Sequence, residues 1–185
     1  MFLTIAANQI FSSLTLLSHF FILFVLVIIV FYKNDSSAKF LKFLAKNVII
    51  FSLIVVLGSV FGSLFYSEII GYSPCKLCWL QRIFMYPQII LLGLALYKKD
   101  NGIIDYALWL SVIGFFIAVY HYFLQMGISL PVPCFATSEI ISCSHRYIMK
   151  FGYITESMMS LTAFVLLIIF AVVFKIFGEK QFINK

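Results

Sequence analysis

The stretch NVIIFSLIVVLGSVFGSLFY, residues 47–66, holds twenty residues and no charged side chain. At a rise of about 1.5 Å per residue, a helix of roughly 20 apolar residues crosses the hydrocarbon core of a bilayer. Four further stretches are almost as apolar, at residues 14–32, 83–97, 104–124 and 154–177. The third stretch in chain order is the shortest, and we expect its helix to begin earlier, within residues 78–82. These stretches predict an all-α polytopic membrane bundle of five helices.

Composition supports this prediction. Hydrophobic residues make up 63% of the 185 positions and charged residues 11%, whereas ordinary soluble domains have about 45–50% and about 25%. No stretch alternates with period two, and lipid leaves unpaired backbone groups without partners, so helices are expected rather than a β-barrel. The first charged residue is Lys33 and no Ala-x-Ala pattern follows the first apolar run, so we expect that helix to be retained rather than cleaved as a signal peptide.

The net charge of +6 does not indicate a nucleic-acid partner, because the basic residues flank the helices. Loops one and three and the C-terminal tail hold nine of the thirteen, and the two cysteine-bearing loops hold four. By the positive-inside rule, this distribution places the nine in the cytoplasm and both cysteine-bearing loops outside. The nine are Lys33, Lys39, Lys42, Lys46, Lys98, Lys99, Lys175, Lys180 and Lys185, and the four are Lys76, Arg82, Arg146 and Lys150.

All four cysteines lie in the two outward loops, as Cys75, Cys78, Cys134 and Cys143. Outside the cytoplasm two disulfides are the natural expectation, and proximity favours Cys75–Cys78 and Cys134–Cys143, although four cysteines allow three connectivities. Closing a loop as short as the first gives little stability, whereas such a pair cycles well between dithiol and disulfide. A helix expected to begin beside it would direct its N-terminal amides at the sulfurs and favour a thiolate. A zinc site with four thiolates is the alternative, which the spacings fit poorly.

Two further polar residues lie close to the predicted membrane. Arg82 follows Cys78 by one helical turn, so it is either a cation beside a redox centre or an arginine that anchors the helix end. His121 lies inside an apolar stretch, where it is either a satisfied packing residue or a proton donor. In the second outward loop, apolar residues between Ile140 and Phe151 recur at helical spacing, which predicts a short surface helix ended by Gly152, with an irregular loop as the alternative.

The stretch PCKLCWLQRIFMYP, residues 74–87, closely resembles the signature of the DsbB/BdbC family of membrane disulfide bond formation proteins. YHYFLQ at residues 120–125 resembles the third core helix of that family. FGYIT at 151–155 and MSLTAF at 159–164 resemble its last helix. The resemblance spans about residues 47–177 and is more specific than a single CxxC, because three ordered matches support it.

This resemblance implies a thiol:quinone oxidoreductase of the bacterial cytoplasmic membrane, with a four-helix core at residues 47–177. An extra transmembrane helix and cytoplasmic loop would occupy residues 1–46, and a cytoplasmic tail residues 178–185. Cys134 and Cys143 would accept electrons from a secreted or periplasmic DsbA-like thioredoxin-fold oxidase. Cys75 and Cys78 would pass them to ubiquinone or menaquinone. The implied quinone-binding residues are Arg82, His121 and Gln81, with no metal.

The sequence departs from the family pattern in two places. The helix before Lys33 lies outside the four-helix core, and Glu156-Ser157 stands where family members commonly carry an apolar residue and proline. Two alternative functions stay open from the residues. One is an enzyme like vitamin K epoxide reductase, which is also a helical bundle with a CxxC. The other is a non-enzymatic membrane subunit with structural disulfides, for which polar residues lining a path would be expected along several helices.

Overall fold

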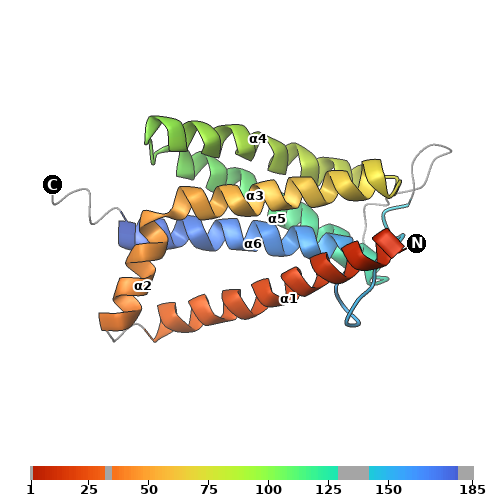
Figure 1. Cartoon of the computed structure of the whole chain (residues 1–185), viewed down its shortest axis with the longest axis horizontal. Coiled ribbons are helices and arrows are strands. Elements are labelled where there is room, and N and C mark those ends of the chain that lie inside the picture. The colour runs from red at the N-terminus through yellow and green to blue at the C-terminus, as the bar shows by residue number, and fades with distance from the viewer. Residues whose placement is uncertain (1, 32–34, 129–141, 179–185) are drawn as a thin grey trace.

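The computed structural model describes residues 2–31, 35–128 and 142–178 of the chain (Figure 1). Within these ranges every regular element is a helix, and the isolated bridge between Lys150 and Ile154 is the single β-type pairing. The elements are α1 (Phe2–Val30), α2 (Asp35–Lys46), α3 (Val48–Leu64), η1 (Phe65–Ile69), α4 (Lys76–Lys98), α5 (Ile103–Gln125), α6 (Glu156–Val173) and η2 (Phe174–Gly178), where η1 and η2 are π-helical turns.

Five helical segments among the described residues are long and apolar enough to cross a membrane, which confirms the predicted polytopic bundle. The third begins ahead of its apolar stretch, as the sequence predicted, but at Lys76 rather than within residues 78–82. The segments are Leu3–Val30, Val48–Ile69, Lys76–Lys98, Ile103–Gln125 and Glu156–Gly178.

Helices α3, α4, α5 and α6 pack side by side as a four-helix core, and α1 lies along α6 (Figure 1). Phe164 of α6 is fully buried at the centre of this core, together with Val56 of α3, Met85 and Leu92 of α4 and Ala118 of α5. The core is therefore built from one apolar stripe of each helix, and α1 is added to its outside.

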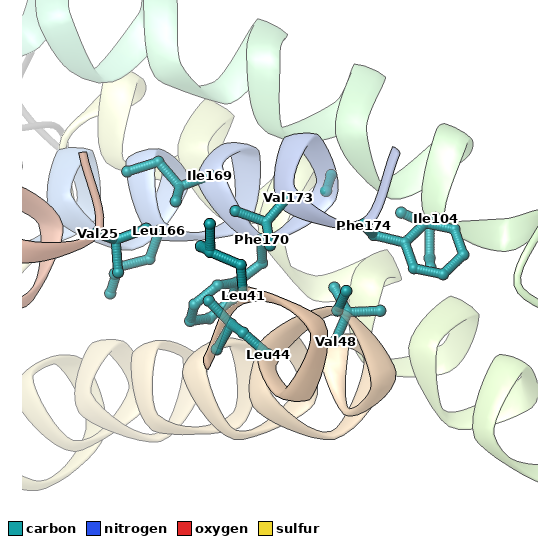
Figure 2. Close-up of a cluster of buried hydrophobic side chains, with 12 residues drawn as sticks. Val25, Leu41, Leu44, Val48, Ile104, Leu166, Ile169, Phe170, Val173 and Phe174 are labelled. Atoms are coloured by element: carbon teal, nitrogen blue, oxygen red, sulfur yellow. The ribbon is translucent and has the colours of Figure 1, made fainter. Parts of the chain in front are cut away.

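Helix α2 differs from the sequence-based expectation, which placed residues 33–46 in a loop. Leu41, Leu44 and Ala45 of α2 are buried against the end of α6 (Figure 2). The lysines of this segment are interleaved with these apolar residues, so one face of the helix packs while the other stays polar. In the sequence, the high lysine content of this segment masks its amphipathic pattern and gives it the appearance of a loop.

The segment after α5 also differs from the expectation. Residues 142–155 contain turns and the Lys150–Ile154 bridge but no helix, so the predicted surface helix is wrong over this range, and its Ile140 and Ile141 lie outside the described residues. Phe151 and Gly152 have φ values of 52° and 78°, which produce a tight turn instead.

The N-terminus, the start of α4 and the segment before α6 lie at one end of the bundle, whereas α2 and the α4–α5 connection lie at the other (Figure 1). The first end carries the described cysteines, and we call it the cysteine end. The second carries six of the eight described lysines, Lys39, Lys42, Lys46, Lys98, Lys99 and Lys175, and we call it the lysine end.

Candidate active site

The site begins at the N-terminus of α4, where the chain turns from extended backbone into helix. Cys75 is the N-cap residue, and its Sγ accepts a hydrogen bond of 3.3 Å from the backbone N–H of Cys78. The two Sγ atoms are 2.9 Å apart, and both cysteines are free thiols in this structure. Cys75 is buried and Cys78 is half-buried. The pair thus lies at a helix N-terminus, where the sequence predicted it.

His121 of α5 meets this pair from the opposite side. Its Nε2 is 3.6 Å from Cys75 Sγ, and its Nδ1 is 3.0 Å from Nε2 of Gln81 on α4. When the Gln81 amide donates to Nδ1, the ring proton is on Nε2 and faces the sulfur. The structure therefore brings together two residues that the sequence only suggested, and it gives Gln81 an orienting contact with His121.

The pKa of the Cys75 thiol is lowered, chiefly by the hydrogen bond with Cys78 and then by the hydrogen bond and charge of His121, while burial opposes the shift. The backbone N–H of Cys78 adds to the lowering. A thiolate is the nucleophilic form of cysteine, so the environment assigns this form to Cys75 when the pair is reduced.

Arg82 lies one turn further along α4 and is largely buried, with 9% of its surface exposed. Its Nε donates to Ser63 Oγ at 2.9 Å and its Nη2 to the Ser63 carbonyl at 3.0 Å. Its Cζ lies 5.2 Å from the centre of the Trp79 ring. These contacts orient the guanidinium, which a snorkelling anchor would not require.

A cavity of about 400 Å³ connects these groups. Such a volume is within the range of small-molecule sites. Its lining includes Cys75, Cys78, Gln81, Arg82 and His121. Every site residue that the sequence predicted within the described ranges, Cys143 apart, therefore faces one space.

Two tyrosines that the sequence did not single out also line the cavity, Tyr66 of η1 and Tyr86 of α4. Among the described residues, their hydroxyl oxygens are buried without a hydrogen-bond partner. A buried hydroxyl without a partner costs free energy, so these two indicate where a ligand with oxygen acceptors would be bound. Nothing in the sequence around Tyr66 distinguishes it from the other tyrosines of the chain.

Glu156 and Gln125 hold the segment before α6 over the cavity. Glu156 Oε1 accepts the backbone N–H groups of Tyr147 at 2.6 Å and Ile148 at 2.7 Å. Gln125 Nε2 donates to Glu156 Oε2 at 3.4 Å and to the His145 carbonyl at 3.2 Å, and the Ser157 hydroxyl donates to Gln125 Oε1. The two residues that depart from the family pattern, Glu156 and Ser157, therefore hold the preceding segment in place by hydrogen bonds. Helix α6 still begins at Glu156, with Thr155 as its N-cap.

Stacked tyrosines connect the same segment to the start of α4. The Tyr147 ring stacks on Tyr72 at 4.1 Å, and the Tyr72 ring stacks on Tyr66 at 5.8 Å. The Tyr147 hydroxyl donates to the Ser73 carbonyl at 3.3 Å. The segment that carries Cys143 is thereby fixed against the segment that precedes Cys75.

Cys143 is buried and disulfide-bonded. Cys134, its expected partner, lies outside the described residues, so the pairing of these two stays a prediction. One ligand atom from each of Cys75, Cys78 and His121 lies within 4.8 Å of the others. Thiolate and imidazole are also zinc ligands, so this geometry is compatible with a metal site as well as with a redox site.

Comparison with known proteins indicates the activity of the chain. The family model described as "Disulfide bond formation protein DsbB" matches residues 45–174. Disulfide bond formation protein C of Bacillus subtilis is 43% identical over 141 residues, which cover 74% of this chain and 99% of that protein. The SPbeta prophage-derived disulfide bond formation protein B of Bacillus subtilis is 44% identical over 120 residues, covering 63% and 80%.

A probable disulfide formation protein of Metapseudomonas resinovorans is 37% identical over 131 residues, which cover 70% of this chain and 90% of that protein. No solved structure matches the chain significantly. The family match includes Cys75, Cys78, Arg82 and His121, and the descriptions of the family and its members favour a thiol oxidoreductase over a non-enzymatic membrane subunit. The chain therefore belongs to the DsbB family of disulfide bond formation proteins, and it is a multi-pass membrane thiol oxidoreductase.

Proposed function

We propose that this protein reoxidises an extracytoplasmic DsbA-like thioredoxin-fold oxidase and transfers the electrons to a membrane quinone. The observation that carries the proposal is the shared cavity. It places the Cys75–Cys78 pair beside Arg82, His121 and two tyrosine hydroxyls that have no partner in the described part of the chain. A thiol pair beside cationic and neutral hydrogen-bond donors is suited to an oxidant whose reactive atoms are carbonyl oxygens. A quinone has this chemistry and accepts two electrons and two protons.

The first half of the reaction is thiol–disulfide exchange at the cysteine end. The reduced partner donates two electrons by attacking the disulfide of Cys143, which we assign to Cys134, through a mixed disulfide. The partner leaves oxidised, and the two loop cysteines become thiols. They then reduce a Cys75–Cys78 disulfide by a second exchange. The tyrosine stack and Glu156 support this step, because they hold the Cys143 segment against the start of α4.

The second half restores the Cys75–Cys78 disulfide. Cys75 is the thiolate of the reduced pair, stabilised by Cys78 and His121. His121 is placed to exchange a proton with Cys75 through Nε2, while Gln81 holds the ring at Nδ1. Arg82 is placed as a hydrogen-bond donor to an oxygen in the cavity. A guanidinium has five N–H groups, and the bonds to Ser63 use one on Nε and one on Nη2. We assign Tyr66 and Tyr86 as further donors.

The same proposal includes a location, the bacterial cytoplasmic membrane, with the cysteine end outside and the C-terminus in the cytoplasm. The structure supports it by gathering the described cysteines at one end and the lysines of α2, of η2 and of the end of α4 at the other (Figure 1). Positive charge favours the cytoplasmic side.

The test is turnover of the purified full-length protein with a reduced thioredoxin-fold oxidase and a quinone. We expect one quinone to be reduced for each partner disulfide formed, followed by quinone absorbance and by thiol titration of the partner. Oxidation of the partner without quinone consumption would overturn the assignment of the acceptor. Quinone consumption without partner oxidation would overturn the assignment of the donor.

A further inference from the structure

Helix α1 lies outside the family model, which begins at residue 45, yet it contributes part of the cavity wall. Phe11, Leu14, Thr15 and Ser18 line the same space as Arg82 and Cys78. We propose that α1 is a lateral wall of the cavity, which contacts the isoprenoid tail of a long-tailed quinone and controls its passage between the cavity and the bilayer. This inference rests on the proposed quinone reduction and names the part of the acceptor that α1 would recognise.

The residues of α1 divide between two faces. Positions 11, 14, 15 and 18 follow the spacing of one helix face and line the cavity. Leu17 and Phe20 lie on another face and are 65% and 62% exposed, as expected for side chains in contact with lipid. One face of α1 is therefore available to a ligand, while the other provides matched controls for substitutions.

The first anchor of α1 is Phe11, which packs against the end of α3 and against η1. Its ring lies 6.4 Å from the Phe65 ring and 5.5 Å from the Tyr66 ring. A Cβ atom on Gly62 would be 2.9 Å from Phe11 Cε1, so the absence of a side chain at Gly62 lets the helices approach. Gly62 is adjacent to Ser63, the residue that holds Arg82.

The second anchor is His19, a polar residue inside a membrane-spanning helix. Its Nε2 is 2.8 Å from Thr162 Oγ1, and its Nδ1 is 3.2 Å from the Tyr153 hydroxyl. The Thr162 hydroxyl donates to the Met158 carbonyl at 2.8 Å, so His19 Nε2 is the donor to Thr162 and Nδ1 accepts from Tyr153. A polar contact of this kind inside a membrane indicates that α1 packs against α6 in one specific position.

These two anchors attach α1 to α3 and to α6, so α1 covers the side of the cavity between those helices. The attachment is light, because 11% of the residues in the most apolar 18-residue stretch of α1 are buried, against 56% in that of α6. A wall with so few buried residues can separate from the core at a lower cost than α3 or α6 could. A lipid-soluble ligand could then enter from the bilayer beside α1.

The lining selects an amphiphile. The polar groups Cys75, Arg82 and His121 line the cavity near the cysteine end, whereas Ile54, Val55 and Leu166 line it toward the lysine end. A long-tailed quinone has this polarity, with carbonyl oxygens at one end and an apolar chain at the other. Thr15 and Ser18 do not disturb the apolar part, because their hydroxyls donate to carbonyls of their own helix at 2.8 Å and 2.9 Å.

The experiment compares Thr15→Trp, which fills the cavity from α1, with Leu17→Trp, which places the same side chain on the lipid face. Both full-length variants are assayed with a long-tailed quinone and with a tailless analogue. Thr15→Trp should raise the Michaelis constant for the long-tailed quinone by about tenfold, because excluding two methylene groups from an apolar site costs about that factor. The Michaelis constant of Thr15→Trp for the tailless quinone should change by less than about twofold, and so should the Michaelis constants of Leu17→Trp for both quinones.

A second measurement needs no substitution. A quinone with a photoreactive diazirine in its tail is bound to the wild-type protein, and the labelled peptides are identified by mass spectrometry. Label on residues 11–18 supports the proposal. Label confined to α3–α6, together with equal kinetics of the Thr15→Trp and Leu17→Trp proteins, overturns it. Failure of the proposed function is distinct, because the wild-type protein would then reduce neither quinone.

Discussion

At the cysteine end of the bundle the buried side chains include His121, Gln81 and Gln125, whereas the buried cluster at the lysine end is apolar throughout (Figure 2). A buried polar group costs free energy unless it is paired, so each partner at the cysteine end also fixes an orientation. Burial of an apolar group is non-directional and depends on area. Substitutions at the cysteine end should therefore change chemistry first, and those at the lysine end should change stability first.

Helix α6 takes part in both ends. Its first turn supplies Glu156 and Ser157 to the hydrogen-bond network over the cavity, and its last turns supply Phe170 and Val173 to the apolar cluster. Helix α6 therefore sets the distance between the hydrogen-bond network over the cavity and the apolar cluster at the lysine end.

The largest expected effect is the loss of turnover in Cys75→Ser and Cys78→Ser. Each change removes a sulfur that must form and break the redox disulfide, so quinone reduction should fall on the order of 10³-fold or more. Thermal stability should change little, because a loop with two intervening residues contributes little as a cross-link. Normal quinone reduction by either purified variant would contradict the mechanism and remove the basis of the comparison.

A second large effect is expected at the outer disulfide. Cys143→Ala leaves Cys134 as a free thiol, which attacks the disulfide of the oxidised soluble oxidase and forms a mixed disulfide while the partner's second sulfur leaves as a thiolate. Because the loop then has no second cysteine to complete the exchange, this adduct should accumulate. Non-reducing gels would detect the adduct, and the double variant Cys134→Ala/Cys143→Ala is the control that should form none. If the single variant forms no adduct under trapping conditions, these cysteines do not receive the partner's electrons.

The lysine end offers the opposite kind of change. Leu41 of α2 is fully buried against α6, so Leu41→Ala should lower the free energy of unfolding by about 2–5 kcal/mol. The Michaelis constant for quinone should stay within about twofold, because Leu41 does not line the cavity. Thermal unfolding in detergent and quinone kinetics on the same preparation measure both. Phe43→Ala is the control, since Phe43 is 57% exposed and should cost much less.

Much of this architecture could be predicted from the sequence. Long apolar stretches specify membrane helices whatever their neighbours, so the five spans are confirmed. The position of Cys75 and Cys78 at the start of a helix follows from local order in the chain, and the structure has them there. Arg82 lies one turn away for the same reason. These features depend on residues that are close in sequence.

Features that depend on distant residues could not be obtained this way. His121 contacts Cys75 across 46 positions, and its ring orientation depends on Gln81 of another helix. Glu156 could be identified as a departure from a family pattern, but its two backbone partners lie in an irregular segment. The fold of α2 became evident only with its partner, the end of α6.

A moderate effect is expected for Arg82→Lys. The guanidinium donates to two atoms of Ser63 at once, and a lysine ammonium cannot reproduce that planar fork. Loss of one charge-assisted hydrogen bond costs roughly 1.5–3 kcal/mol, so the Michaelis constant for quinone should rise about tenfold or more. Expression and disulfide pairing should remain normal. The same exchange at the exposed Arg146 should be silent, and equal kinetics for both variants would reduce Arg82 to a helix anchor.

The smallest expected effect concerns Glu156→Gln, which tests whether the carboxylate holds the Cys143 segment in place. Glutamine keeps one oxygen for the N–H groups of Tyr147 and Ile148, but it removes the negative charge and presents an amide where Gln125 now donates. A hydrogen bond to a charged acceptor exceeds a neutral one by roughly 1 kcal/mol, so local opening of the segment should become about fivefold more frequent.

The rate at which a small dithiol reduces the Cys143 disulfide reports this opening, because Cys143 is buried until the segment moves. We expect a rise of about fivefold in Glu156→Gln, with reduction of the Cys75–Cys78 disulfide changed far less. Glu68→Gln is the matched control, since Glu68 accepts from the exposed Ser67 hydroxyl at the same end of the bundle and holds no loop. An unchanged rate at Cys143 would show that the tyrosine stack, rather than Glu156, fixes the segment. In that case Tyr147→Leu should accelerate the reduction instead, because the stacked Tyr72 ring would lose its partner at 4.1 Å.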